Sequence, residues 1–168
     1  LLFSFATGSA LLSLAVFVVA ALRIARWETF LLLGGGLLAC SPRKCVSLVW
    51  PLFKRGHTRL THFFGLVFLG FSGVYFVWAL APELSPDGTA YHLGLVSRYL
   101  REQGFASVPD NMYACLSQGA EMLFLFAFAF GRHSAAALVH FSFLLALPWA
   151  MMCYGRRFGF PVPAMAAA

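Results

Sequence analysis

The stretch FFGLVFLGFSGVYFVWALA, from Phe63 to Ala81, carries no charged side chain in nineteen residues. A helix needs about 20 mostly apolar residues to cross the hydrocarbon core of a bilayer. Two runs of similar length and character, Leu1 to Leu22 and Ala135 to Tyr154, lie on either side of it in the sequence. This pattern predicts helices that cross a membrane.

The composition of the whole chain leads to the same prediction. Hydrophobic residues make up 61% of the 168 residues, charged residues make up 11%, and the mean hydropathy is +0.80. A soluble domain of this size could not bury so many apolar side chains. We therefore predict a single all-α unit over residues 1–168, folded as a polytopic transmembrane helical bundle.

Two further spans are less regular in sequence. Thr29 to Cys40 is too short to cross alone, and Val46 to Phe53 can extend it after a Ser-Pro break. Met122 to Phe130, with the turn that precedes it, gives another span, and the Gly-Arg-His sequence at 131–133 separates it from the last one. The sequence thus predicts four to five spans.

Basic residues predict how the chain is oriented in the membrane. Five of the 12 lysines and arginines lie within residues 43–59, so the positive-inside rule places this segment in the cytoplasm. Residues 82–118 then form a non-cytoplasmic loop, and five of the six acidic residues lie in it or at its edge. The net charge of +6 follows this pattern, and the expected partners are membrane lipids, not nucleic acid. Arg156 and Arg157 fall on the outer side in this scheme, against the rule.

The loop contains a predicted amphipathic helix from Asp87 to Glu102. At 100° per residue its apolar side holds Thr89, Leu93, Val96 and Leu100, and its polar side holds Asp87, Tyr91, Gly94, Arg98, Arg101 and Glu102. Such a helix can lie on the bilayer surface with its apolar side toward the lipid. We expect Gly104 to end this helix and Asp110 to cap the next turn.

The polar side of this helix has two interpretations. A carboxylate at a membrane surface near arginines suits an enzyme with a lipid-phosphate donor, in which Asp87 takes the acceptor proton and Arg98 or Arg101 holds the phosphate. The other interpretation is structural, because Ser-Pro-Asp-Gly is also a common helix start, in which Asp87 caps free amide groups. The pattern leaves both open.

Three segments, Pro86–Leu93 (PDGTAYHL), Val108–Tyr113 (VPDNMY) and Gln118–Leu123 (QGAEML), resemble bacterial GT-C-type polytopic glycosyltransferases. In that superfamily, which includes the protein O-mannosyltransferases, an aspartate that starts a membrane-surface helix in the first large outer loop is the proposed catalytic base. The resemblance implies this role for Asp87, with a polyprenyl-phosphate sugar as donor, in the bacterial cytoplasmic membrane. The implied substrate-binding residues are Tyr91, His92, Arg98, Arg101 and Glu121.

The sequence departs from that family in two respects. Pro86 stands where the family often has tryptophan, and the full enzymes have many more spans than this chain. The start at Leu1 and the apolar end at Met165–Ala168 also suggest an N-terminal fragment, whose own activity the sequence does not decide. The sugar, the acceptor and any need for a divalent metal stay open.

Histidines within the spans support an alternative function. His62 and His140 are candidate axial ligands to haem or chlorophyll, in a non-catalytic accessory subunit of an electron-transfer or light-harvesting complex. An interhelical hydrogen bond is the structural interpretation of the same residues. The four cysteines, Cys40, Cys45, Cys115 and Cys153, lack metal-site spacing, so no protein-bound metal site is predicted. A transporter is disfavoured, because the spans carry almost no charge and show no inverted repeat.

Overall fold

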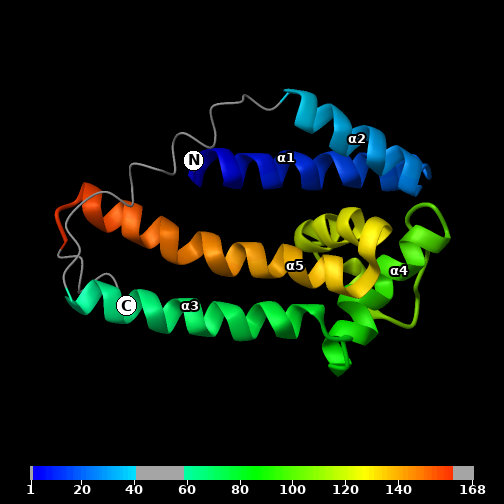
Figure 1. Ribbon diagram of the computed structural model, residues 1–168. Helices are drawn as coiled ribbons and strands as arrows, with labels where there is room; N and C mark the ends of the chain where they lie inside the picture. Colours follow the sequence, from blue (N-terminus) through cyan, green and yellow to red (C-terminus); the bar gives the residue numbers. More distant parts are fainter. Residues whose placement is uncertain (1, 41–58, 161–168) are drawn as a thin grey trace.

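The computed structural model describes residues 2–40 and 59–160, and all regular structure in these ranges is helical (Figure 1). The elements are α1 (Leu2–Ala21), α2 (Trp27–Cys40), α3 (Arg59–Leu80), the π-helix η3 (Gly88–His92), α4 (Leu93–Arg101), the 3-10 helix η4 (Met112–Cys115) and α5 (Gly119–Arg157). The all-α prediction is confirmed for the described residues. Most of the basic segment 43–59, the extension Val46 to Phe53 and Cys45 lie outside them.

Three described helices, α1, α3 and α5, are long and apolar enough to cross a bilayer. The shorter apolar helix α2 has 14 residues. Side chains along α3 are largely uncovered by protein, as Leu69 (68% exposed) and Trp78 (76%) illustrate. Because water would not solvate such a surface favourably, these helices fit a membrane protein.

Helix α5 is the centre of the bundle and contacts each of the other four α-helices. It runs antiparallel to α3, because the Ser134 hydroxyl donates to the Leu80 carbonyl at 3.2 Å and the rings of Phe76 and Phe141 lie 5.8 Å apart. The end of α1, the start of α2, the end of α3 and all of α4 lie together at the right of Figure 1. We call this the loop end of the bundle.

A break divides α5 at the predicted position. Gly131 (φ −143°, ψ 19°) and Arg132 (φ 52°, ψ −137°) leave the helical conformation, which confirms the separator at 131–133. The part before the break, residues 119–130, has twelve residues and a length of about 18 Å, too short to cross about 30 Å of hydrocarbon. The predicted span Met122 to Phe130 is therefore a half-length helix.

This half-length helix starts inside the bundle. The Ser13 hydroxyl, near the middle of α1, donates to the Gly119 carbonyl at 2.7 Å, whereas Phe126 lies 5.9 Å from Phe30 at the start of α2. The chain thus enters the bundle after α4 and returns toward the loop end before the break. The described residues give three helices of spanning length, fewer than the predicted four to five.

The break also changes the predicted place of the last basic residues. From the contact between Phe76 and Phe141, α3 extends about 25 Å back to Arg59 and α5 about 24 Å forward to Arg157. The end of α5 therefore lies at the same end of the bundle as the start of α3 (Figure 1). The predicted scheme placed Arg157 on the side of the loop, because it counted residues 122–130 as a full crossing.

The buried core gathers at the loop end. Its largest fully buried side chains come from four helices, namely Val16, Phe30, Val96, Tyr99, Met122 and Leu125. Leu93 and Val96, which we expected on the lipid side of the surface helix, are in this core. Residues 86–101 are helical, but much of their apolar side packs against protein, chiefly against α5.

Helix α4 ends in a turn that fixes it to α1. Gln103 takes a positive φ of 59°, and the amide of Gly104 donates to the Tyr99 carbonyl at 2.9 Å, as in a Schellman motif. The helix ends next to Gly104, as expected, but the residue with the left-handed backbone conformation is Gln103 and not the glycine. Gly104 is required for a different reason, because a Cβ there would lie 2.6 Å from the Ala20 carbonyl oxygen.

Gly104→Ala is therefore expected to lower the free energy of unfolding by about 1–3 kcal/mol, since two backbone segments would have to separate. Thermal unfolding of the purified protein measures this change. Gly35→Ala is the matched control, because a Cβ at Gly35, in the interior of α2, meets no atom within 4 Å. It should be neutral or stabilise by up to about 1 kcal/mol. Equal melting temperatures for the two variants would contradict the close packing of Gly104.

Candidate functional site

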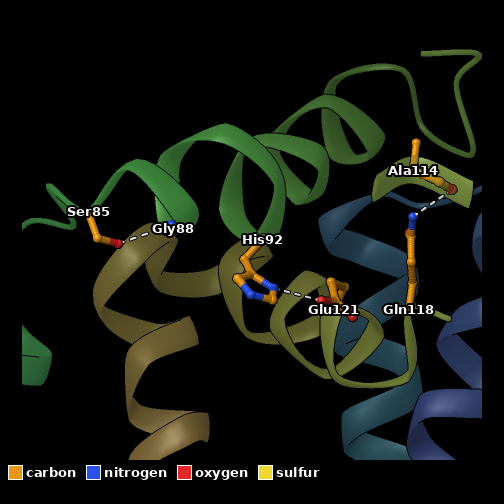
Figure 2. Close-up of polar contacts among 6 residues, drawn as sticks. All are labelled: Ser85, Gly88, His92, Ala114, Gln118 and Glu121. Atoms are coloured by element: carbon orange, nitrogen blue, oxygen red, sulfur yellow. Dashed lines mark hydrogen bonds and ion pairs between the residues drawn. The ribbon is translucent and has the colours of Figure 1, made fainter. Parts of the chain in front are cut away.

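The candidate site begins after the end of α3, where the chain enters the helix of residues 86–101. This helix, made of η3 and α4 with the two residues before them, lies across the loop end, and we call it the crossing helix. Ser85 is the N-cap of this helix, because its hydroxyl accepts a hydrogen bond from the Gly88 amide at 3.0 Å (Figure 2). Pro86 takes the first helical position, which requires no amide hydrogen. Asp87 makes no capping hydrogen bond and is exposed. The structural interpretation of Asp87 as the cap is therefore wrong; Ser85 has that role.

The first turns of this helix are wider than an α-helix. Residues 88–92 form a π-helix, in which the Leu93 amide donates to the Gly88 carbonyl. Gly94 permits this geometry, because a Cβ there would lie 2.3 Å from the carbonyl oxygen of Thr89. Single π-turns occur often at functional sites, where they change the direction of side chains. Here the π-turn contains two predicted site residues, Tyr91 and His92.

His92 and Glu121 form a polar pair between the crossing helix and α5. Figure 2 shows the imidazole pointing to the carboxylate, with His92 Nδ1 and Glu121 Oε1 2.7 Å apart. The Glu121 side chain is only 11% exposed, whereas that of His92 is 39% exposed. A carboxylate that accepts from Nδ1 fixes the ring and leaves Nε2 free to act on another molecule. Glu121 thus orients His92.

Tyr91 is close enough to both carboxylates of the site to be affected by their charge. Partial burial raises the pKa of its phenol, and the negative charges of Asp87 and Glu121 raise it further. Its ring stacks on that of Tyr113 with centroids 4.2 Å apart. Asn111 caps η4 by accepting from the Tyr113 amide at 3.1 Å and donates to the Ala90 carbonyl at 3.3 Å. The predicted cap Asp110 is wrong by one residue.

The structure brings together four predicted site residues: Asp87, Tyr91, His92 and Glu121. It separates the two arginines from them. Arg98 is about 16 Å and Arg101 about 21 Å from Asp87 along the helix. Arg98 donates to Glu102 Oε1 at 2.9 Å and to the Ser107 carbonyl at 3.3 Å. Both arginines are therefore distant from Asp87 along the helix, and Arg98 is already paired with Glu102.

The two histidines of the alternative function lie far apart. His140 is next to Phe141, which contacts Phe76, and His62 is about 21 Å from Phe76 along α3. They could not ligate one haem or pigment together. His140 is exposed, and its ring lies 6.4 Å from that of Phe124. In the described ranges no three His, Cys, Asp or Glu residues gather where they could hold a metal ion.

Ser85→Ala should lower the free energy of unfolding by about 1 kcal/mol through loss of the N-cap. The effect should depend on pH, because hydrogen bonds from Ser85 lower the pKa of Glu83 below its ordinary value of 4.5. Glu83 therefore stabilises the fold above about pH 4.5, and this contribution is lost as the pH falls through its folded pKa. The difference in melting temperature between the wild type and Ser85→Ala should be larger at about pH 7 than at about pH 3.

Ser97→Ala is the control, since the Ser97 hydroxyl donates to the Gly94 carbonyl within the helix and caps nothing. Equal destabilisation by both variants would contradict the capping role of Ser85.

Comparison with known proteins leaves this geometry as the main guide to function. No family model, curated protein or solved structure was found to match the chain.

Proposed function

We propose that this chain is a glycosyltransferase, or part of one, that transfers a sugar from a polyprenyl-phosphate donor at a membrane surface. The observation that carries the proposal is the exposed Asp87 carboxylate, which the Ser85 cap leaves free at the start of the crossing helix. A carboxylate in this position is available to take a proton from a bound molecule. The resemblance of residues 86–93 to GT-C-type enzymes supports the same role.

The proposed reaction is a direct displacement with inversion at the anomeric carbon. Asp87 takes the proton of the acceptor hydroxyl while the acceptor oxygen bonds to the anomeric carbon. The bond from that carbon to the phosphate oxygen breaks, and polyprenyl phosphate leaves with the bonding electrons. His92, held by Glu121, offers Nε2 to the substrate, and Tyr91 contributes its hydroxyl. Because the arginines of α4 lie far from Asp87, His92 is the nearer group for the donor phosphate.

We place the loop end on the non-cytoplasmic side of a bacterial cytoplasmic membrane. In the sequence, the densest basic stretch is residues 43–59, between α2 and the start of α3, which holds five of the 12 basic residues. The positive-inside rule favours the cytoplasm for this stretch. The site then faces the compartment in which the resembling enzymes use lipid-linked sugars.

The experiment that tests this function is a transfer assay with the full natural protein in liposomes. A labelled polyprenyl-phosphate sugar is the donor, and release of the label from the lipid is measured with and without candidate acceptors. Transfer that depends on Asp87 supports the proposal. Absence of turnover by a folded protein with every common polyprenyl-linked sugar would contradict it.

The exposed ring of His140 favours a second candidate, an accessory subunit that contacts a pigment. An absorption spectrum of the gently purified protein tests it, together with an intact mass. A visible chromophore with stoichiometric partner proteins would support the accessory subunit. A longer chain without a chromophore would support the glycosyltransferase.

A further inference from the structure

Three arginines from three separate segments line one hollow at the loop end. Arg26 precedes α2, Arg101 ends α4 and Arg132 lies in the break of α5. The hollow has a volume of about 670 Å³, and its only carboxylate is that of Glu28. These four side chains leave a net charge of +2 around one space.

The three guanidinium groups have no partner within the described part of the protein. Its ion pairs join His92 to Glu121 and Arg98 to Glu102 only. Neither pair involves a side chain of the hollow. Exposed arginines need no partner, but three that line one hollow with a single carboxylate leave a positive potential that favours an anion there.

The start of α2 adds to the same positive potential. Trp27 and Glu28 occupy its first turn and line the hollow. The first amide groups of a helix have no partner within the helix and carry its positive dipole. The negative charge of Glu28 offsets part of this positive potential, but the three arginines carry more charge than Glu28 does. Together, an arginine cluster and a helix N-terminus form an environment that binds phosphate groups.

The conformation of Arg132 is an independent observation. Its φ of 52° and ψ of −137° lie in a region that favours glycine, yet the sequence has arginine there. The neighbouring glycine, Gly131, has a negative φ, so it is not at the position where a glycine would relieve the strain. Strained non-glycine residues cluster at binding sites, where the side chain has a use.

We propose that this hollow binds a phosphate group, carried either by a membrane lipid headgroup or by a soluble phosphate. Trp27, Leu100 and Phe128 add an apolar wall beside the arginines, which suits an amphiphile as well as a free anion. The site is separate from the proposed catalytic residues, because Arg101 lies about 21 Å from Asp87 along the helix. The proposal therefore does not depend on the proposed function.

Native mass spectrometry of the full natural chain in detergent tests the proposal. The probes are dioleoylphosphatidic acid and dioleoylglycerol, which share their acyl chains and differ in the phosphate. We expect tight binding of phosphatidic acid only. Arg26→Gln, Arg101→Gln and Arg132→Gly should each weaken it about tenfold, the effect of losing one hydrogen bond between charged groups. Glycine is used at 132 because it tolerates the positive φ.

Arg23→Gln is the matched control, since Arg23 is exposed near Arg26 but does not line the hollow. It should leave binding unchanged. Displacement of the lipid by inorganic pyrophosphate would indicate that a soluble phosphate is also a ligand, and retention of the lipid would indicate a headgroup site. Equal binding of both lipids, or equal loss in Arg23→Gln and Arg101→Gln, would overturn the proposal. Melting temperatures show that each variant is folded.

Discussion

Asp87→Asn is expected to lower the rate of sugar transfer by about 100- to 10,000-fold, the usual contribution of a general base. Asparagine has almost the same shape as aspartate but cannot take a proton from the acceptor. Because Asp87 is exposed and caps nothing, its replacement should leave the melting temperature unchanged. The measurements are the single-turnover rate with a labelled polyprenyl-phosphate donor and thermal unfolding of the same preparation.

Asp110→Asn is the matched control for this prediction. Asp110 is an exposed carboxylate in the same loop, and the cap of η4 is its neighbour Asn111. Neutralising it changes the net charge by the same amount, and Asp110 is not among the charges that act on Tyr91. Full transfer by Asp87→Asn, or equal loss in both variants, would show that Asp87 is not the base.

The sequence predicted the parts of the fold that depend on local composition. The apolar runs at the start of the chain and at 63–81 form the spanning-length helices α1 and α3, and the last helix is interrupted at Gly131 as expected. A helix also follows Ser85 and ends before Gly104. In each case the signal is an apolar run, a glycine or a capping residue, so a few neighbouring residues are enough to specify the structure.

The parts that were missed depend on contacts between distant segments. Nothing within residues 119–130 shows that their start meets Ser13 in the middle of α1, so an apolar run was interpreted as a full span. The hollow was missed because Arg26, Arg101 and Arg132 are far apart in sequence. The only local indication of a binding role for Arg132 was its charge, at the break between two apolar runs.

The candidate site was predicted only in part, because some of its residues are close in sequence and others meet only through packing. Asp87 and Tyr91 are close in sequence, so a helical pattern could group them, whereas His92 was named only through the resemblance of residues 86–93. The pairing of His92 with Glu121 depends on the packing of the crossing helix on α5. The sequence held one signal for the π-turn that was not used: Gly88 stands at its start, and Gly94 follows two residues after its end.

Gly94→Ala is expected to lower sugar transfer about as much as Asp87→Asn, although residue 94 has no polar side chain to lose. A Cβ at this position would lie 2.3 Å from the Thr89 carbonyl oxygen, a backbone atom that cannot rotate away. If the π-turn closes to an α-turn, the Leu93 amide pairs with Thr89 in place of Gly88. The residues before the turn then rotate by about 100° relative to those after it. Asp87 would leave the face that it shares with Tyr91.

Three measurements distinguish this effect from general unfolding. Gly70→Ala is the control, because a Cβ at Gly70 in α3 meets no atom within 4 Å, and this variant should keep full transfer. The Gly94→Ala protein should still melt cooperatively, since the buried side chains of α4 follow the turn. In the double variant Asp87→Asn/Gly94→Ala, the rate should be no lower than in either single variant, because both changes remove the same proton acceptor. Independent, multiplying losses would mean that the π-turn does not act by positioning Asp87.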